Sequence, residues 1–385
     1  MKTTLADLSY STAAGRWARL GPYYAMFPIP FVERIVSLFS RKGDTVIDPF
    51  CGRGTTPFIA MINGRKGVGC DNNPIAWLYS KTKTDPYPEI EAVRTRISQV
   101  REAVTRDDCQ PINEFQELAF CRIVLGFVNA GKRILNWQED QLDRTVITML
   151  IQHLHDKKGH GLSNQLRHSR ALSPDYCIRW WKTNGYEKPP EIEPDKFLAK
   201  RLHWRYAKGT PRPAGMDAPA IGLGKASSCL PKTDRPADLV ITSPPYSNVT
   251  DYRADNWIRL WALGEGPELP DWNAEQKYTN TELYGEMLLK SFITTCNYTH
   301  RGTVWYIRSD ARLRTRNMIS GILAKILPNH RAYELPAPYV RKTQTALYGD
   351  DGPKPGEIDL LYLPPRRKRL GFTIQFKPSN FSFCN

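Results

Sequence analysis

The chain has 385 residues, which suits a full-sized catalytic domain with one inserted or appended unit rather than one minimal domain. Lysine and arginine outnumber aspartate and glutamate by 54 to 39, and the net charge of +15 favours a polyanionic partner such as nucleic acid. The eight cysteines form no CxxC pair, which argues against zinc and disulfide frameworks, and no apolar run reaches the roughly 18 residues that span a membrane. We therefore expect a cytoplasmic protein with no metal and no membrane partner.

Secondary-structure signals follow one another along the chain in the order of an α/β protein. Residues 44–48 predict a strand that ends at a glycine-rich turn, residues 59–66 predict a helix and residues 67–71 a second strand. From residue 89 to 155 apolar residues recur at helical spacing, and strand signals return only at residues 237–242. Strands and helices then alternate, which predicts an open, largely parallel, doubly wound α/β sheet with helices on both faces.

These signals divide the chain into four segments. Residues 1–85 are expected to form the N-terminal part of the catalytic domain, and residues 221–370 its C-terminal part. Residues 86–220 are expected to form a largely helical, basic insertion that recognises the target, and residues 371–385 a tail.

A glycine-rich turn at residues 48–56, DPFCGRGTT, stands where the first strand meets a helix. Its two glycines, Gly52 and Gly54, let the backbone approach a ligand closely. Asp71 ends the next strand 23 residues after Asp48, near the spacing at which an acidic side chain meets ribose hydroxyls in dinucleotide folds. The turn lacks the Gly-Lys-Ser/Thr ending of a phosphate-binding loop, so the sequence predicts a site for an adenosine-containing cofactor without a triphosphate.

A second motif, Ser243-Pro244-Pro245-Tyr246, directly follows the predicted strand at residues 237–242. Two consecutive prolines cannot continue a strand ladder, so the chain must leave the sheet as a rigid, extended loop. The Ser243 hydroxyl and the Pro244 carbonyl can accept hydrogen bonds from an exocyclic base amine, which would help its nitrogen rehybridise towards an electrophilic methyl group. This loop is therefore the predicted catalytic site, and the alternative is an ordinary proline turn.

The two motifs resemble those of the DNA amino-methyltransferase family, whose cofactor motif reads DPFxGxGTT. The resemblance implies a Rossmann-like, doubly wound methyltransferase sheet that binds S-adenosyl-L-methionine. It also implies that Asp48 and the loop at residues 50–55 hold the amino-acid part of the cofactor and that Asp71 contacts the ribose. Phe27 would close over the methionine end.

One family feature is missing from this sequence. An acidic residue commonly ends the strand before the catalytic one and contacts the adenine, but here Ser227 or Ser228 stands in that region, and Ser228 is the expected contact. The full set of expected cofactor-binding residues is Phe27, Asp48, Phe50, Cys51, Gly52, Gly54, Thr55, Asp71, Asn72 and Ser228.

The form of the second motif bears on the target base. In the family, SPPY is typical of cytosine-N4 enzymes, whereas (Asp/Asn)-Pro-Pro-Tyr most often accompanies adenine-N6 methylation. The resemblance therefore implies N4 of a flipped-out cytosine with Tyr246 stacked on it, and adenine N6 is the alternative. Methylation of cytosine C5 would need a thiolate in a Pro-Cys context, which the chain lacks. An RNA amino-methyltransferase, or a silent DNA-binding relative, is less favoured because no RNA-binding signature is visible and both motifs are intact.

Target recognition is expected between the two motifs. Asn164, Gln165, Arg167, His168 and Arg170 carry amides and cations that suit the base edges and phosphates of double-stranded DNA. The alternative is a solvated helix face. Because such enzymes usually protect host DNA beside a nuclease, a separately encoded restriction endonuclease is a further expected partner, although an orphan enzyme would share the same sequence features.

Overall fold

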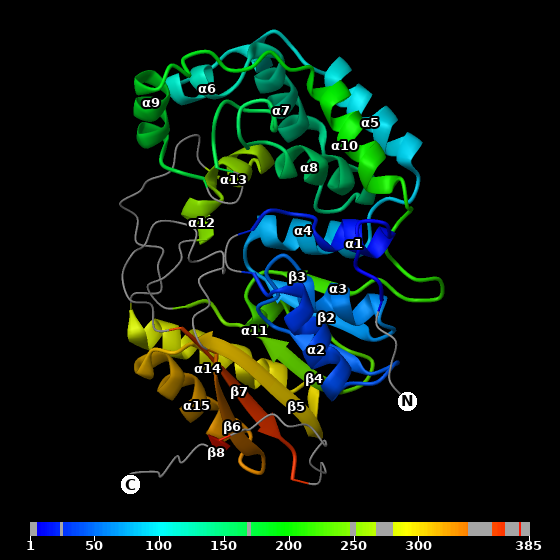
Figure 1. The fold of residues 1–385 in the computed structure, drawn as a ribbon, viewed down its shortest axis with the longest axis vertical. Helices are drawn as coiled ribbons and strands as arrows, with labels where there is room; N and C mark the ends of the chain where they lie inside the picture. The colour runs from blue at the N-terminus through cyan, green and yellow to red at the C-terminus, as the bar shows by residue number, and fades with distance from the viewer. Residues whose placement is uncertain are drawn as a thin grey trace.

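One mixed sheet forms the lower half of the molecule in Figure 1. The computed structural model describes residues 6–23, 26–167, 171–246, 252–266, 280–337, 356–365 and 377–378. Within these ranges the strand order is β3-β2-β1-β4-β5-β7-β6-β8, in which β1 to β5 are parallel and β7 is antiparallel to β5 and β6. The strands are β1 Thr45–Asp48, β2 Lys66–Asp71, β3 Ala220–Leu223, β4 Ala237–Thr242, β5 Thr299–Asp310, β6 Arg331–Ala337, β7 Glu357–Leu363 and β8 Lys377–Pro378.

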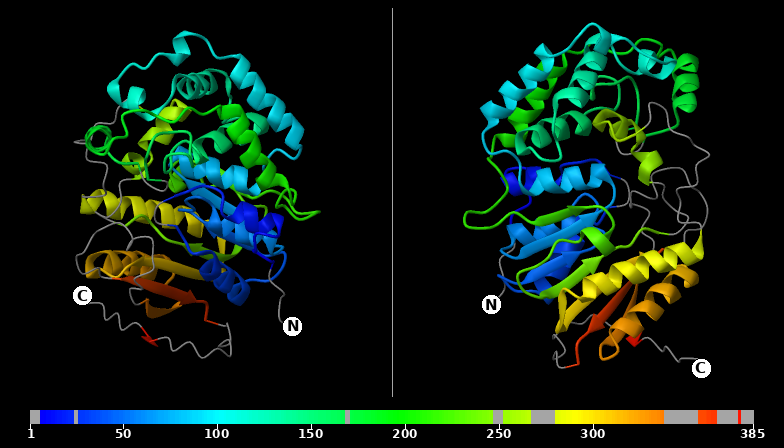
Figure 2. Two further views of the ribbon diagram at one scale, coloured as in Figure 1. Left: turned by 45° about the horizontal axis from the view of Figure 1, so that its top comes forward. Right: turned by 180° about the vertical axis from the view of Figure 1, so that it is seen from behind.

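Alternation along the strands explains why helices cover both faces of this sheet. Val46 and Tyr306 belong to one buried cluster, whereas their chain neighbours Ile47 and Trp305 belong to a second cluster on the opposite face. Figure 2 shows the helices of the second face from behind. The first face packs against α2 Ile29–Phe39, α3 Thr55–Ile62 and α4 Pro74–Thr84, and α1 Ala13–Ala18 contacts α3 and α4. The second face packs against α11 Ala226–Cys229, α14 Thr281–Cys296 and α15 Leu313–Ile326.

A group of helices lies above the sheet in Figure 1. It comprises α5 Ile90–Glu102, α6 Glu114–Ala119, α7 Arg122–Ile134, α8 Gln141–Gln152, α9 Pro174–Thr183 and α10 Pro194–Tyr206. Two helices from later in the chain, α12 Tyr252–Asp255 and α13 Trp257–Leu263, join this group. The Trp257 ring lies 4.9 Å from the Phe115 ring, and Trp261 stacks on Phe120 at 5.8 Å between centroids. No helix among the described residues is both long and apolar enough to cross a bilayer.

The predicted doubly wound, largely parallel sheet with a helical insertion is confirmed. The prediction that strand signals return only at residues 237–242 is wrong, because β3 forms earlier and pairs with β2 through Gly69 and Ile221. β3 has only four residues, Ala-Ile-Gly-Leu, too few to show an alternating pattern, so its strand structure depends on its neighbour. The segment boundaries after residues 85, 220 and 370 stay predictions.

Candidate active site

Two neighbouring strand ends bring the two sequence motifs together. β1 and β4 pair in parallel, with Ile47 opposite Val240, so their carboxyl ends meet at the same edge of the sheet. The Thr242 hydroxyl donates to Asp48 Oδ1 at 2.5 Å and joins the two ends directly. Motifs that are far apart in the sequence therefore lie side by side, at the edge where open α/β sheets bind ligands.

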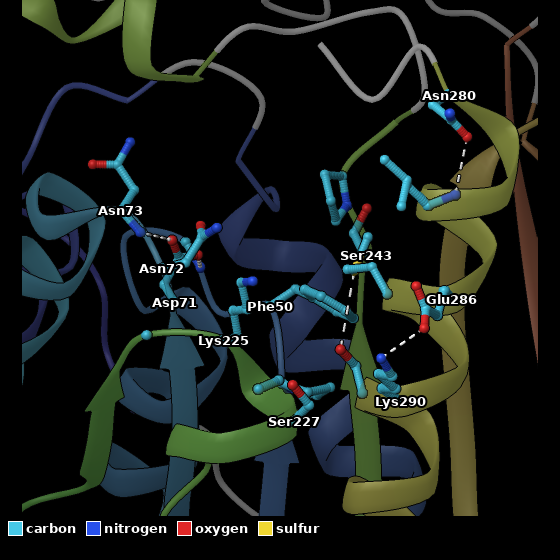
Figure 3. Close-up of a pocket in the computed structure, with 18 of the residues that line it drawn as sticks. Phe50, Asp71, Asn72, Asn73, Lys225, Ser227, Ser243, Asn280, Glu286 and Lys290 are labelled. Atoms are coloured by element: carbon cyan, nitrogen blue, oxygen red, sulfur yellow. Dashed lines mark hydrogen bonds and ion pairs between the residues drawn. The ribbon is translucent and has the colours of Figure 1, made fainter. Parts of the chain in front are cut away.

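A cavity of about 680 Å³ opens at this edge and touches both motifs (Figure 3). This volume lies within the range of small-molecule sites. In Figure 3, Asp71 and Asn72 lie on the left, Ser243 lies towards the right, and α14, which carries Glu286 and Lys290, lies further to the right. The residues that line the cavity are Tyr23, Pro49, Phe50, Gly52, Asp71, Asn72, Asn73, Gly224, Lys225, Ala226, Ser227, Ser243, Pro245, Asn280, Leu283, Glu286, Met287, Lys290 and Ser291.

The glycine-rich turn is held closely against α4. Gly54 has φ +78°, and a Cβ atom there would lie 2.1 Å from Ser80 Oγ and 2.9 Å from Ser80 Cα. Lys83 Nζ donates to the Arg53 carbonyl at 2.7 Å, and Arg53 Nη1 donates to the Gly21 carbonyl at 2.9 Å. The turn therefore has a fixed path that requires glycine at position 54.

Asp71 fastens the turn to the end of β2. Its Oδ2 accepts a hydrogen bond from the Gly52 amide at 2.9 Å, and its Oδ1 accepts one from the Asn73 amide at 2.9 Å. Burial raises the pKa of Asp71 to about 6. Burial likewise raises the pKa of Asp48, only 1% of which is exposed, to about 7. A ligand that offers hydroxyl donors or positive charge would favour the ionised form of both carboxyl groups.

These groups fit a nucleoside-containing cofactor. The Asp71 carboxylate lines the cavity, and each oxygen keeps a further lone pair that can accept a ribose hydroxyl. Phe50 and Met287 supply apolar surface for a purine ring on the same cavity. The described residues contain no group of three or more His, Cys, Asp or Glu side chains placed to hold a metal ion.

The structure brings many of the predicted site residues to this cavity. Phe50, Gly52, Asp71 and Asn72 of the expected cofactor set line it, as do Ser243 and Pro245 of the expected catalytic set. The other expected site residues of the two motifs do not line the cavity: Asp48, Cys51, Gly54, Thr55 and Pro244 are buried, and Tyr246 is half-buried. Their individual roles stay predictions.

Two further expected cofactor residues, Phe27 and Ser228, also do not line the cavity. Phe27 packs against Phe31, with ring centroids 5.3 Å apart, and Tyr23 from the same N-terminal stretch lines the cavity instead. Ser228 is exposed and donates to the Lys225 carbonyl at 3.3 Å, whereas Ser227 lines the cavity. Successive side chains on the short helix α11 point about 100° apart, so only one of the two serines can face the ligand.

The wall formed by α14 was missed by the sequence reasoning. The helix contributes residues that recur every three or four positions, namely Leu283, Glu286, Met287, Lys290 and Ser291, and its N-cap Asn280 also lines the cavity. Lys290 pairs with Glu286 at 2.7 Å on this face. The helical periodicity of this segment is visible in the sequence, but the sequence does not show that this face of the helix lines a cavity.

The second motif is fixed from two sides. The Tyr284 hydroxyl on α14 donates to the Pro245 carbonyl at 2.9 Å. The Tyr246 hydroxyl donates to Glu357 Oε1 at 3.0 Å, and burial raises the pKa of Tyr246 well above its usual range. The loop therefore presents Ser243 to the cavity from a preformed position.

The predicted DNA-reading residues separate into three groups. Asn164 is fully buried, and its Nδ2 donates to the carbonyls of Leu118 at 2.9 Å and Tyr186 at 2.6 Å. The prediction that Asn164 contacts DNA is therefore wrong, because its amide satisfies backbone carbonyls inside the helical group. His168 and Arg170 lie outside the described residues.

Gln165 and Arg167 form the third group, because they line a second cavity of about 190 Å³. Its other lining residues are Leu166, Leu172, Tyr176, Cys177, Trp180 and Trp181. The Trp257 indole donates to the Leu172 carbonyl at 3.0 Å, which ties this wall to α13. Polar side chains and aromatic rings thus line the same cavity in the helical group, and a hydrogen bond links this cavity wall to α13, a helix that follows the second motif in the sequence.

The parallel sheet, the glycine-rich turn after β1, the acidic residue after β2 and the shared cavity together define a Rossmann-like methyltransferase fold. A family model described as DNA methylase, N6_N4_Mtase, matches residues 5–108, so this part of the chain is similar to the DNA amino-methyltransferases. The family implies S-adenosylmethionine as the methyl donor.

Similar proteins are matched over short segments. The chain is 35% identical over 69 residues to the type II methyltransferase M.BglI of Bacillus subtilis, covering 15% of this chain and 20% of that protein. It is 43% identical over 47 residues to the orphan methyltransferase M.BamHII of Bacillus amyloliquefaciens, covering 12% and 18%. The matched segments thus span a fifth or less of the relatives' own length.

Among solved structures, an rRNA methyltransferase, aviRa from Streptomyces viridochromogenes, aligns over 91% of this chain and 90% of its own. The TM-score is 0.33 and the sequence identity is 11%. A likeness at this level says nothing about what this chain acts on.

Proposed function

We propose that the chain transfers a methyl group from S-adenosylmethionine to an exocyclic amino nitrogen in double-stranded DNA, and that N4 of cytosine is its target. The observation that carries this proposal is the single cavity that reaches from Asp71 to Ser243. A cofactor held at one end and a base amine held at the other would lie close enough to react, and alignment of this kind is a main source of rate enhancement.

The residues of the chain have distinct tasks in this reaction. Asp71 would bind the ribose, while Phe50 and Met287 would hold the purine. S-adenosylmethionine, when bound, supplies a methyl group on a positively charged sulfur. The Ser243 hydroxyl oxygen would accept a hydrogen bond from the target N–H, so that the nitrogen lone pair is turned towards that methyl group.

Access to the base requires that the nucleotide leave the duplex. The cost of flipping is roughly a few kcal/mol, which stacking on an aromatic ring such as Tyr246 partly offsets. The net charge of +15 would hold the phosphate backbone, and Gln165 and Arg167 offer an amide and a cation at the second cavity to read bases.

The choice of cytosine rests on the serine of SPPY. The matching family model covers both N6 and N4 methylation, and both reactions use the same acceptor geometry, so adenine N6 is the competing target. We also propose a role beside a restriction endonuclease, since one relative is a type II methyltransferase; another relative is an orphan, for which no such partner would be needed.

The test is methyl transfer to unmethylated genomic DNA from radiolabelled S-adenosylmethionine, followed by mass spectrometry of the nucleosides. We expect N4-methylcytosine, and Ser243→Ala should lower the transfer rate by about 10²-fold because an acceptor used in the transition state is lost. Ser37→Ala is the matched control, since Ser37 Oγ only donates to the Arg34 carbonyl on α2. Labelled N6-methyladenine would mean that adenine is the target base. Label in RNA and not in DNA in a parallel reaction with RNA, or no label in either nucleic acid, would overturn the proposal.

Cofactor affinity should depend on pH through Asp71. The pKa of this carboxyl group is raised to about 6. Its two oxygens already accept hydrogen bonds from the Gly52 and Asn73 amides, so only the ionised form can accept two ribose hydroxyls as well. Binding therefore favours the ionised form, lowers its pKa and weakens as pH falls through 6. We expect S-adenosylmethionine to bind about tenfold more weakly near pH 5 than near pH 7.5.

Isothermal titration calorimetry across this pH range measures the effect. Asp71→Asn should bind more weakly near pH 7.5 and should lose the part of the pH dependence that falls near pH 6, because the amide does not titrate. An equal affinity of the unaltered protein at both ends of the range would contradict this role of Asp71.

A further inference from the structure

Three side chains beside the cavity form a continuous chain of hydroxyl and carboxylate groups. The Ser243 hydroxyl donates towards the Tyr246 oxygen at 3.5 Å, and the Tyr246 hydroxyl donates to Glu357 Oε1 at 3.0 Å. The first distance is longer than an ordinary O–H···O bond, and such bonds in ligand-free active sites commonly shorten when substrate binds. The chain thus runs from the cavity to a carboxylate that lies in neither sequence motif.

The direction of β7 explains why Glu357 reaches this edge of the sheet. β7 is antiparallel to β5, and Glu357 pairs with Asp310 at the carboxyl end of β5. The first residue of β7, rather than its last, therefore lies beside the ends of the parallel strands. A parallel strand in the same place would put its first residue at the far edge.

A half-buried arginine, Arg308, pairs with the Glu357 carboxyl group. Arg308 Nη1 lies 3.5 Å from Glu357 Oε2. The other carboxylate oxygen, Oε1, accepts the hydrogen bond from the Tyr246 hydroxyl. Arg308 is fixed in turn by two hydrogen bonds to Asp359, at 2.7 and 2.8 Å, and its guanidinium lies 3.7 Å from the centroid of the Phe31 ring. The arginine thus presents a stationary positive charge to Glu357.

We propose that Glu357 is a positioning residue that fixes the direction of this hydroxyl chain, so that Ser243 meets the target amine as a hydrogen-bond acceptor. Glu357 accepts the Tyr246 hydroxyl on Oε1 and faces Arg308 with Oε2, so the Tyr246 hydroxyl points its proton at the carboxylate. The Tyr246 oxygen then accepts the single proton of the Ser243 hydroxyl. The lone pairs of Ser243 Oγ are left for the N–H groups of the base.

The alternative orientation would oppose the reaction. A serine hydroxyl free to rotate could donate its proton to the ring nitrogen that neighbours the exocyclic amine in cytosine or adenine. It would then hold the base without drawing electron density towards the reacting nitrogen. Glu357, at the far end of the hydroxyl chain, prevents this orientation of the Ser243 hydroxyl, whether the base is cytosine or adenine.

This inference rests on the proposed methyl transfer, and single-turnover kinetics separate the two. We expect Glu357→Gln to lower the rate of methyl transfer from bound S-adenosylmethionine to bound DNA by about tenfold, because an amide can donate as well as accept and no longer fixes the direction. Dissociation constants for cofactor and DNA should change less than about twofold, since Glu357 is not in the cavity lining. Glu334→Gln on the adjacent strand β6 is the control, because that carboxylate pairs with Arg316 instead.

A double-mutant cycle tests whether Glu357 acts through Tyr246. In a Tyr246→Phe protein the hydroxyl chain is already broken, so adding Glu357→Gln should change the rate less than about twofold. An undiminished tenfold effect in that background, or a Glu357→Gln rate equal to that of the unaltered protein, would overturn the inference. Absence of methyl transfer by the unaltered protein would overturn the proposed function instead.

Discussion

Asp71→Ala is expected to lower the affinity for S-adenosylmethionine by roughly 10³-fold, since it removes charge-assisted bonds to ribose hydroxyls that contribute about 1.5–3 kcal/mol each. The substitution also removes the carboxylate that accepts hydrogen bonds from the Gly52 and Asn73 amides. The turn would lose its link to β2 as well as its contact with the ligand. Equilibrium binding measured by calorimetry gives the affinity, and methyl transfer at saturating cofactor gives the residual rate.

Asp44→Ala is the matched control for Asp71→Ala. Asp44 stands just before the opposite end of β1 and accepts a hydrogen bond from the Arg41 amide at 2.7 Å, outside the cavity. We expect cofactor affinity within about twofold of the unaltered protein in this variant. A loss for Asp71→Ala no greater than that for Asp44→Ala would show that the ribose is held elsewhere.

Gly54→Ala is expected to destabilise the fold by about 3 kcal/mol and to abolish measurable cofactor binding. About 1–2 kcal/mol comes from placing an alanine at φ +78°, and a further 1–3 kcal/mol comes from the overlap of its Cβ with Ser80. The overlap includes the Ser80 Cα atom, so rotation of the serine side chain cannot relieve it. The turn must therefore move away from α4, which displaces the amide of Gly52 from Asp71.

Gly64→Ala isolates the conformational part of this effect. Gly64 follows the same helix, α3, with φ +77°, but the nearest atom to its added Cβ is Lys42 Cγ, in a side chain, at 3.4 Å. Chemical denaturation should give a loss of about 1 kcal/mol for Gly64→Ala with cofactor binding retained. Equal losses for the two variants would mean that the contact between the turn and α4 is not as close as the structure has it.

The parts of the site that sequence predicts well are those whose geometry is set by a few consecutive residues. The turn from Asp48 to Thr56 and the loop from Ser243 to Tyr246 carry glycines and prolines that restrict the backbone wherever they occur. Asp71 follows from strand spacing. The doubly wound sheet follows from the order of strands and helices.

The parts that sequence does not predict depend on pairing between distant segments. α14 faces the cavity only because it packs against β5 of the sheet, and Glu357 reaches Tyr246 only because β7 runs antiparallel to β5. Asn164 shows the opposite error, since a polar side chain was interpreted as exposed although the fold buries it against backbone carbonyls. Composition and local pattern contain no information on any of these contacts.

The pairing of β1 with β4 has a consequence for the order of folding. Ile47 and its partner Val240 are separated by helices α5 to α10 of the helical group, so this strand pair has a very large sequence separation. At synthesis rates of about 5–20 residues per second, β1 would wait roughly 10–40 s for β4 to be made. Helices α5 to α10, which precede β4 in the chain, can form during that wait. The ligand cavity would then be among the last features to form, and an N-terminal fragment that ends before β4 would carry the glycine-rich turn without being able to complete the site.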